Sequence, residues 1–393
     1  MFLRWLSASV RCSLLTGLIS VFAAEVVAAP ISATDFADAV KSIKQVGPEG
    51  QGNAEASAAF QRLISAGPGQ LIAVLSTVDD DTSPRAANWL ESAAETIAAK
   101  SIEQKLPLPA KDLEQFVLDR KHHPASRRLA FDLLVQVDPT APDRLVPGML
   151  NDPSVELRRL SVERVIAEGE ATLKAEKKPE ALEIFKKAMS GARDDDQVQA
   201  IVKRLEELGE KVDLPKHFGF VTTWHLIGPF DNREKKGFNV AYPPEKMVDL
   251  TEEIEGKEGV KVKWTPYSTP DRYGTVDLAK AQDKFKGAIS YAVAEFVSDK
   301  DQTVDVRLGT PNAWKVWVNG ELIFAREEYH RGHKLDQYKM RTRLKPGRNE
   351  ILIKVCQNEQ KEDWAQEWQF QLRICDSTGT AVLPATPATA SAR

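Results

Sequence analysis

The pattern of apolar residues changes once along this chain, near Leu214-Pro215, and this change most limits the folds open to it. Before it, apolar residues recur three and four positions apart, as on one face of an amphipathic helix. After it, short runs rich in Val, Ile and aromatic residues alternate with turn residues, as in antiparallel strands. We therefore predict an α-helical region over residues 33–213 and an all-β region over 217–378.

Three of the predicted helices begin in a similar way. Pro84, Pro124 and Pro153 each follow a residue that can cap a helix and precede a basic, then apolar, segment. The sequence NDPSVELRR, which contains Pro153, resembles the opening of the second helix of a HEAT repeat. The resemblance implies a solenoid of stacked helix pairs that presents a surface to other proteins. The last two predicted helices, 179–189 and 197–208, look closer to a TPR-like hairpin that ends the stack.

The clearest turn of the β region is Asn319-Gly320, which lies between two apolar runs. Asn-Gly readily adopts the positive φ angles of a two-residue turn, so residues 316–323 are predicted to form a β-hairpin. The runs ILIKVCQ and WQFQLRIC are interpreted as a second hairpin, with Cys356 opposite Trp368. Cys375 then lies too far along its strand for a disulfide, at about 3.3 Å per residue. We expect Cys356 and Cys375 to be separate, buried thiols, and the sequence assigns them no redox role.

Several segments of the β region occur in an order that is informative as a set. They are 224–232 (WHLIGPFDN), 242–245 (YPPE), 248–250 (VDL), Trp264, 276–278 (VDL), 291–292 (YA), 315–320 (KVWVNG), Arg331, 336–337 (DQ), 344–349 (LKPGRN) and 353–355 (IKV). Together they resemble the galactose-binding-like jelly-roll domains of many exported bacterial proteins. The resemblance implies a β-sandwich of two antiparallel sheets. Some relatives bind sugars or calcium and others have a structural role, so the fold alone does not settle the function.

Three tryptophans are candidate carbohydrate-binding residues. Trp314, Trp364 and Trp368 lie near loops or strand ends, where an exposed indole could stack on a sugar ring. The alternative for each is a place in the core, which we expect for the tryptophans at 224, 264 and 317 because they alternate with other apolar residues within strands. Trp364 lies in an expanded polar loop, 358–366, where we expect a specific contact.

The segment 327–336 (EEYHRGHKLD) contributes four further candidate ligand-binding residues, which are Tyr329, His330, Arg331 and Asp336. His330, His333 and Asp336 could in principle ligate a transition metal. No helix aligns the two histidines, and only the Arg and Asp belong to the family pattern. We therefore predict an ordinary loop in which the Arg and the Asp are paired, and no metal site.

Calcium is the one cofactor for which the sequence offers candidates. Asp231 and Asn232 directly follow a predicted strand and could provide oxygen ligands. The alternative is that both side chains stabilise the turn in which they lie.

The first residues predict export. Arg4 and Arg11 supply positive charge, Leu14 to Ala24 form an apolar run, and Ala28 marks a cleavage site, so residues 1–28 are interpreted as a signal peptide. The run is short for a membrane span, although an uncleaved anchor remains the alternative. We expect a periplasmic or extracellular protein without a stable membrane span after cleavage. At the other end, residues 379–393 are rich in Ala, Thr and Pro, which predicts a disordered tail.

Composition and motifs exclude some classes of function. The chain has 53 basic and 57 acidic residues, a balance that does not suggest a nucleic-acid partner. No P-loop, nucleophile elbow or zincin helix occurs, so we expect no enzyme, and a hydrolase is the least expected class.

Two hypotheses about the function remain. One is an interaction protein whose helices bind a protein partner, with the β-sandwich as a second binding or scaffold surface. The other is a carbohydrate-binding protein that recognises a polysaccharide or cell-wall glycan through the jelly roll. Exposure of the three candidate tryptophans would favour the second, and their burial the first.

Overall fold

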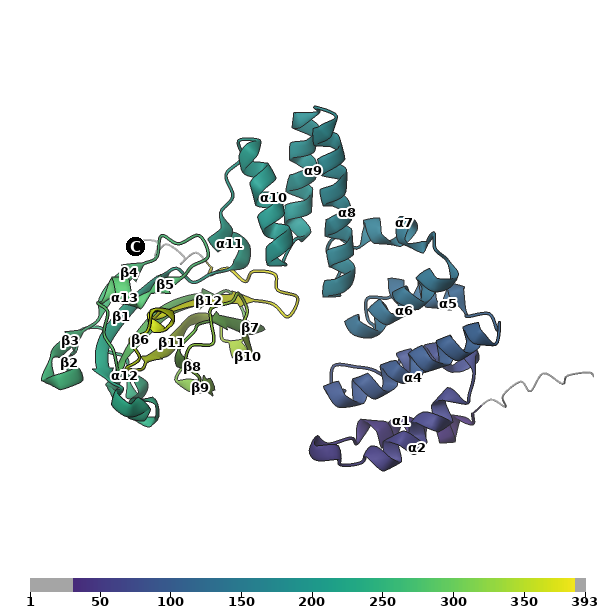
Figure 1. The fold of residues 1–393 in the computed structure, drawn as a ribbon, viewed down its shortest axis with the longest axis horizontal. Coiled ribbons are helices and arrows are strands. Elements are labelled where there is room, and N and C mark those ends of the chain that lie inside the picture. The colour runs from purple at the N-terminus through teal and green to yellow at the C-terminus, as the bar shows by residue number, and fades with distance from the viewer. Residues whose placement is uncertain (1–30, 386–393) are drawn as a thin grey trace, which may run out of the picture. The chain divides into compact units, whose positions relative to one another are not determined.

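The computed structural model describes residues 31–385, so the predicted signal peptide at 1–28 lies outside the described residues. The contacts within the chain define two compact units, Met1–Asp138 and Pro139–Arg393. The first unit is helical, and the second contains further helices followed by antiparallel sheets (Figure 1). Among the residues that the structure describes, no helix is both long and apolar enough to cross a membrane.

Capping residues and packing on α4 organise the first unit. Its helices are α1 (Ala33–Lys44), α2 (Asn53–Ile64), α3 (Leu71–Leu75), α4 (Pro84–Glu103), α5 (Ala110–Leu118) and α6 (Pro124–Val137). The hydroxyl of Ser83 accepts a hydrogen bond from the Ala86 amide at 3.2 Å and so caps α4. The long helix α4 packs against α1, α2, α3 and α6. Pro84 and Pro124 open helices as predicted, whereas Pro153 precedes a helix that starts at Val155.

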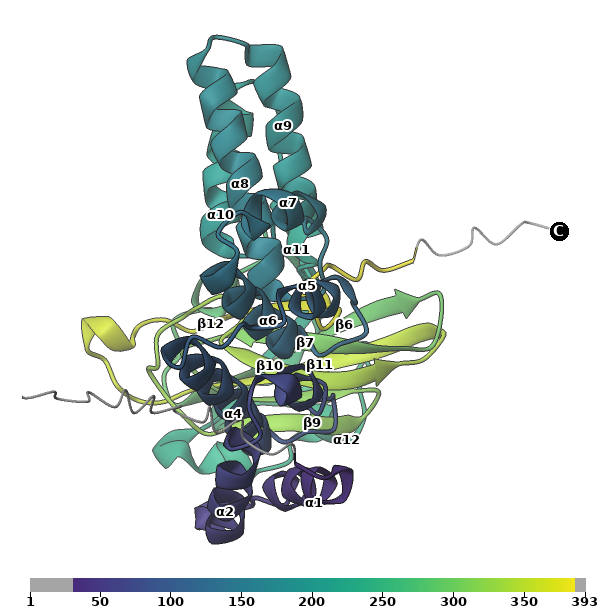
Figure 2. The ribbon, with the colours of Figure 1, turned by 90° about the vertical axis from the view of Figure 1, so that its right-hand side faces the viewer.

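The helices of the second unit share a core with its sheets. They are α7 (Ala141–Leu145), α8 (Val155–Lys174), α9 (Lys178–Gly191), α10 (Asp195–Glu207) and α11 (Leu214–Phe218). The helices α8 and α9 lie side by side (Figures 1 and 2). Gly169 permits this approach, because a Cβ there would lie 2.9 Å from the ring of Phe185. Phe218 and Phe220 belong to the same core as α8–α10, and Tyr273 from the β part packs against it.

Two antiparallel sheets form the main body of the β part. One has the strand order β4-β1-β6-β11-β8-β9 and the other β10-β7-β12-β5, and β2 and β3 form a separate pair. The strands are β1 (Thr223–Asp231), β2 (Glu253–Glu255), β3 (Lys261–Lys263), β4 (Thr265–Ser268), β5 (Val276–Asp277), β6 (Ala288–Ser298), β7 (Gln302–Gly309), β8 (Ala313–Val318), β9 (Glu321–Arg326), β10 (Tyr338–Leu344), β11 (Gly347–Gln357) and β12 (Gln369–Cys375). Two short helices, α12 (Pro243–Lys246) and α13 (Leu278–Ala281), lie in the connections.

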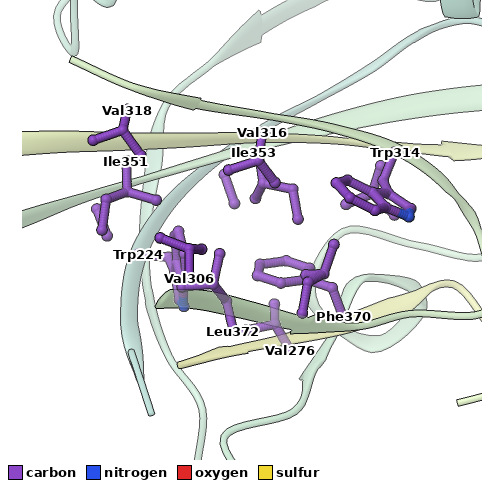
Figure 3. Close-up of a cluster of buried hydrophobic side chains, with 14 of the residues drawn as sticks. Trp224, Val276, Val306, Trp314, Val316, Val318, Ile351, Ile353, Phe370 and Leu372 are labelled. Atoms are coloured by element: carbon purple, nitrogen blue, oxygen red, sulfur yellow. The ribbon is translucent and has the colours of Figure 1, made fainter. Parts of the chain in front are cut away.

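The apolar core lies between these two sheets. Val316 and Ile353 from one sheet point toward Phe370 and Leu372 from the other (Figure 3). A second cluster, which includes Trp264, Tyr291 and Trp317, covers part of the opposite face of the six-stranded sheet. This arrangement confirms the predicted order of a helical part followed by an antiparallel β part.

One predicted hairpin is confirmed and the other is wrong. The strands β8 and β9 are joined at Asn319 (φ 52°) and Gly320 (φ 80°), with Val318 paired to Glu321. By contrast, β11 and β12 do not pair with each other, because β11 lies between β6 and β8, and β12 lies between β7 and β5. The loop between them crosses from one sheet to the other. Cys356 and Cys375 are nevertheless both free and buried, and burial raises the pKa of these thiols to about 12 and about 11.

The start of the predicted tail is held against the sheets. The carboxylate of Asp376 accepts hydrogen bonds from the amides of Thr378 and Thr380. The amide of Val382 donates to the carbonyl of Ile374, and that of Ala385 donates to the carbonyl of Val297. These bonds order residues 376–385, which include the first part of the segment predicted to be disordered, and residues 386–393 lie outside the described part of the chain.

Candidate functional site

Two of the three candidate tryptophans cannot contact a ligand. Trp314 is 0% exposed and Trp368 is 1% exposed. The Trp314 ring packs on Tyr338, with centroids 4.8 Å apart, and the Trp368 indole donates to the carbonyl of Val355 at 3.3 Å. Trp314 lies in β8 and Trp368 directly precedes β12, and both belong to the core between the sheets, so the core alternative holds for these two residues. The tryptophans at 224, 264 and 317 are buried, as predicted.

Trp364 is exposed and stands among polar side chains. It lies on a short 3₁₀ turn, Asp363–Ala365, and 62% of it is accessible to solvent. The ring of His330 meets it edge-on, with centroids 5.0 Å apart and an interplanar angle of 90°. Nε2 of His330 in turn lies 3.0 Å from Oδ1 of Asn358. The predicted site residues Trp364 and His330 are therefore neighbours, although they are far apart in sequence.

Tyr329 and Asn232 complete this group, which we call the Trp364 cluster (Asn232, Tyr329, His330, Asn358 and Trp364). The buried Asn232 amide donates to the Tyr329 hydroxyl and to the carbonyl of Gln357, both at 3.1 Å. Its carbonyl oxygen has no hydrogen-bond partner among the described residues. Burial raises the pKa of Tyr329, so its hydroxyl keeps its proton near neutral pH. Asn232 thus connects the turn after β1 to Tyr329 and to the end of β11.

The adjacent carboxylate of Asp231 is paired within its own turn. Nε and Nη2 of Arg233 donate to its two oxygens at 3.0 and 2.8 Å. Hydrogen bonds from Arg233 lower the pKa of Asp231 below its ordinary value, despite the opposing effect of partial burial. The Asp231 side chain therefore stabilises its own turn, whereas the Asn232 side chain bonds to Tyr329 and Gln357 outside that turn.

The remaining predicted site residues lie elsewhere. Arg331 pairs with Glu328, with Nε 3.3 Å from the carboxylate. Asp336 instead accepts hydrogen bonds from Arg307 and Arg373, so the predicted pairing of Arg331 with Asp336 is wrong. The His333 side chain is largely buried beside Gly309. Within residues 31–385, no cluster of three or more His, Cys, Asp or Glu side chains is placed to hold a metal ion.

A second candidate site lies in the helical unit and was not predicted. A groove of about 530 Å³ opens between the α1–α2 connection and α4. Its lining residues are Val46, Gly47, Gly50, Asn53, Phe60, Arg85, Asn88, Trp89 and Ser92. We call it the helical groove.

Two aromatic rings and one arginine give the helical groove its chemistry. Phe60 and Trp89 meet edge to face, with centroids 5.7 Å apart, and both are half-buried. Arg85 is exposed, and no other described residue forms an ion pair or hydrogen bond with its side chain. The spacing of Arg85, Asn88, Trp89 and Ser92 places them on one face of α4. That three- and four-residue spacing is the sequence signal that could have revealed this groove.

Comparisons with known proteins do not assign the chain to a family. No family model and no curated protein matches it. Among solved structures, it is similar to a β-glucosidase from Kluyveromyces marxianus (12% identity, TM-score 0.25), over 39% of this chain and 16% of that one. A Faecalibacterium prausnitzii β-glucuronidase matches with 13% identity and a TM-score of 0.23, over 40% of this chain and 31% of that one. A Xanthomonas citri GH31 α-xylosidase matches with 13% identity and a TM-score of 0.20, over 41% and 17%. The match spans less than a third of each of these proteins, and the TM-scores are too low for the likeness to bear on function.

Proposed function

We propose that this chain is an exported, non-catalytic interaction protein in which a HEAT-like helical solenoid binds a protein partner. A galactose-binding-like jelly roll, built from the two antiparallel sheets, provides a second binding or scaffold surface. Support for this comes from the order of helices before sheets and from the burial of Trp314 and Trp368. The observation that carries the proposal is the helical groove, with two aromatic rings and a free arginine.

The chemistry of the helical groove indicates the kind of peptide segment it would take. An apolar side chain would pack on the rings of Phe60 and Trp89, which are half-buried and held by each other. A nearby acidic side chain would pair with Arg85, which has no such partner within residues 31–385. Partly buried aromatic residues and arginines are the types that most often dominate binding energy at protein interfaces.

A selection of displayed peptides against the full chain tests this function. We expect enriched peptides to combine an acidic residue with an apolar one. Their affinity should fall about 30-fold or more on Trp89→Ala, because truncating a central aromatic residue costs about 2 kcal/mol. Arg85→Glu should weaken them about 10-fold through charge repulsion. The affinities can be measured by titration calorimetry.

The control for Arg85→Glu is Lys111→Glu. Both residues are exposed and lie in the first turn of a helix, α4 and α5, where a glutamate is compatible with the helix dipole. Lys111→Glu should leave the peptide affinity unchanged. Peptides that bind equally well to the Trp89→Ala, Arg85→Glu and unaltered chains would contradict a role for the groove.

Carbohydrate binding by the jelly roll is the second candidate function. It is favoured by the Trp364 cluster, where an indole that is 62% exposed stands beside the side chains of His330 and Asn358. Such a ring can stack on a sugar while the adjacent polar groups bond to its hydroxyls. Only one of the three candidate tryptophans supports this role, so it ranks below protein binding.

For this second function, we expect saturable binding to at least one member of a panel of soluble and insoluble polysaccharides. Trp364→Ala should weaken that binding at least about 10-fold, since the ring would carry the stacking contact. Met247→Ala is the matched control, because Met247 is 66% exposed on another part of the same unit. A chelator should have no effect, since the Asp231 carboxylate is already paired with Arg233. Absence of saturable binding across the panel would exclude this function and leave the first standing.

A further inference from the structure

The four edge strands of the two main sheets differ in how well they are protected. Strands at a sheet edge present unpaired N–H and C=O groups, and proteins block them with proline, charge or short length. The edge strand β4 contains Pro266, and β5 has only two residues. The edge strand β10 carries Lys339, Arg341 and Arg343. These three edges are poorly suited to pairing with another strand.

The fourth edge strand, β9, has none of these three protections, and its one irregularity is a β-bulge at Ile323. Its sequence is ELIFAR, with no proline and with charges only at its two ends. Among the described residues, β8 is its only hydrogen-bonded neighbour in the sheet (Figure 1). Leu322 and Phe324 are 48% and 46% exposed. An apolar edge of this kind favours the addition of another strand.

We propose that β9 pairs with β9 of a second copy of this chain, in antiparallel orientation about a two-fold axis. Ile323 is the extra residue of a β-bulge in β9, so an axis through Phe324 places Glu321 of each copy opposite Arg326 of the other, with both side chains on the same face of the sheet. The two-fold repeats this contact, so the dimer contains two pairs of opposite charge at the ends of the strand pair. Leu322 then lies opposite Ala325 in the apolar centre. The charges at the two ends of β9 are therefore complementary to those of a second, inverted copy.

The side chains at the ends of β9 are available for this contact. Arg326 is about half exposed and lies 2.8 Å from Glu328 in its own chain, so a second carboxylate can approach its free side. Glu321 is exposed and adjoins the tight turn at Asn319-Gly320. A register shift relative to β8 occurs at Ile323, between the residues paired with Val316 and Trp317. Because Ile323 is an extra residue, Glu321 and Arg326 point to the same face of the sheet, so each can face its counterpart in an inverted copy.

The test is sedimentation equilibrium of the full chain and of two single charge reversals, Glu321→Arg and Arg326→Glu. We expect the unaltered chain to show a concentration-dependent monomer–dimer equilibrium. Each reversal places like charges opposite each other at both ends of the strand pair, so each variant alone should dimerise at least about 10-fold more weakly. Both substitutions lie at exposed positions, and their thermal unfolding should match that of the unaltered chain.

Mixing the two variants distinguishes β9 self-pairing from other contacts. In a mixed dimer, position 321 of the Glu321→Arg chain faces position 326 of the Arg326→Glu chain, so the two introduced charges are opposite in sign. At the other end of the strand pair, the unaltered Arg326 of the first chain faces the unaltered Glu321 of the second. Association should therefore return to the strength of the unaltered chain or exceed it. The proposal is overturned if the unaltered chain is monomeric at all concentrations, if the single reversals dimerise as well as it does, or if mixing restores nothing.

Discussion

Replacing Asp336 by alanine is expected to lower the free energy of unfolding by about 3–5 kcal/mol, the usual cost of removing one partner from a buried ion pair. Arg307 on β7 and Arg373 on β12 are register partners, and both are almost fully buried. Asp336 accepts bonds from Nε and Nη2 of Arg373, both at 2.6 Å, and from Nη1 of Arg307 at 2.7 Å. Without this carboxylate, two adjacent guanidinium groups would lose the anion that they share. Urea unfolding monitored by tryptophan fluorescence measures the loss.

The control for Asp336→Ala is Arg331→Ala, which breaks an exposed pair with Glu328. Pairs of this kind contribute little to stability, so we expect almost no change in the midpoint of unfolding. Equal effects of the two substitutions would contradict the structural role assigned to Asp336.

The lowered pKa of Asp336 leads us to expect that the free energy of unfolding depends on pH. Burial tends to raise the pKa of Asp336, but the hydrogen bonds and charges of Arg373 and Arg307 outweigh it and hold the pKa below the ordinary value. Its contribution is therefore complete above the ordinary aspartate pKa of about 3.9 and is lost as the pH falls through the lower folded-state value. Asp336→Ala should be less sensitive to acid in this range than the unaltered chain.

Replacing Lys354 by methionine is expected to destabilise the second unit by a similar amount, about 3–5 kcal/mol. The Lys354 side chain is 0% exposed, and its ammonium group donates to Glu245 at 2.7 Å. It also donates to the carbonyls of Gly237, Phe238 and Val240 at 2.9, 3.1 and 2.9 Å. The substitution would leave a buried carboxylate and three carbonyl groups without their donor. Urea unfolding gives the free energy, and hydrogen exchange should show loss of protection over residues 233–246.

Two further variants distinguish the effect of leaving a buried charge unpaired from the effect of removing a lysine in general. Lys345→Met removes an exposed lysine near the start of the same strand and should change stability little. Adding Glu245→Gln to Lys354→Met should recover part of the loss, because no unpaired charge then remains buried. If Lys354→Met were no more destabilising than Lys345→Met, the buried network around Lys354 would not have the role described.

Periodicity in the sequence predicted the local elements well. The three- and four-residue spacing of apolar positions gave the helices, and the Asn319-Gly320 turn gave the β8–β9 hairpin with its positive φ angles. The burial of Trp314 and Trp368 was also present in the pattern. Trp314 alternates with Val316 and Val318, and Trp368 begins the series 368, 370, 372, 374 of inward-facing residues. Nearness to a strand end made both residues candidates for sugar binding, but this alternation favours the core alternative that was given for each of them.

The periodicity of the sequence could not predict which strands pair with each other. The strands β11 and β12 are consecutive and both apolar, so they resemble a hairpin, but their partners come from β6, β8, β7 and β5. The choice depends on contacts distant in sequence. The strand β10 was not predicted, because alternate positions carry Lys339, Arg341 and Arg343 on its exposed face and only Met340 and Leu344 are buried.

The candidate sites depend on the same long-range contacts. His330 lies in the loop between β9 and β10, and Trp364 lies in the loop between β11 and β12. The two rings are in contact only because the folded sheets bring these two loops together. Asp336 meets Arg307 and Arg373 only after β7 has paired with β12. The sequence therefore identified Trp364 and His330 as residues of interest, without indicating that Asp336 would instead belong to a buried ionic group.

The most direct test of the proposed function is hydrogen exchange of the full chain with and without a peptide selected by display. The proposal predicts slower exchange in the two segments that form the helical groove, 46–60 and 84–92. It also predicts that this protection disappears in Arg85→Glu and persists in Lys111→Glu. Protection confined to the polar loop at 358–366 or to other parts of the second unit, with none in the groove, would contradict the account.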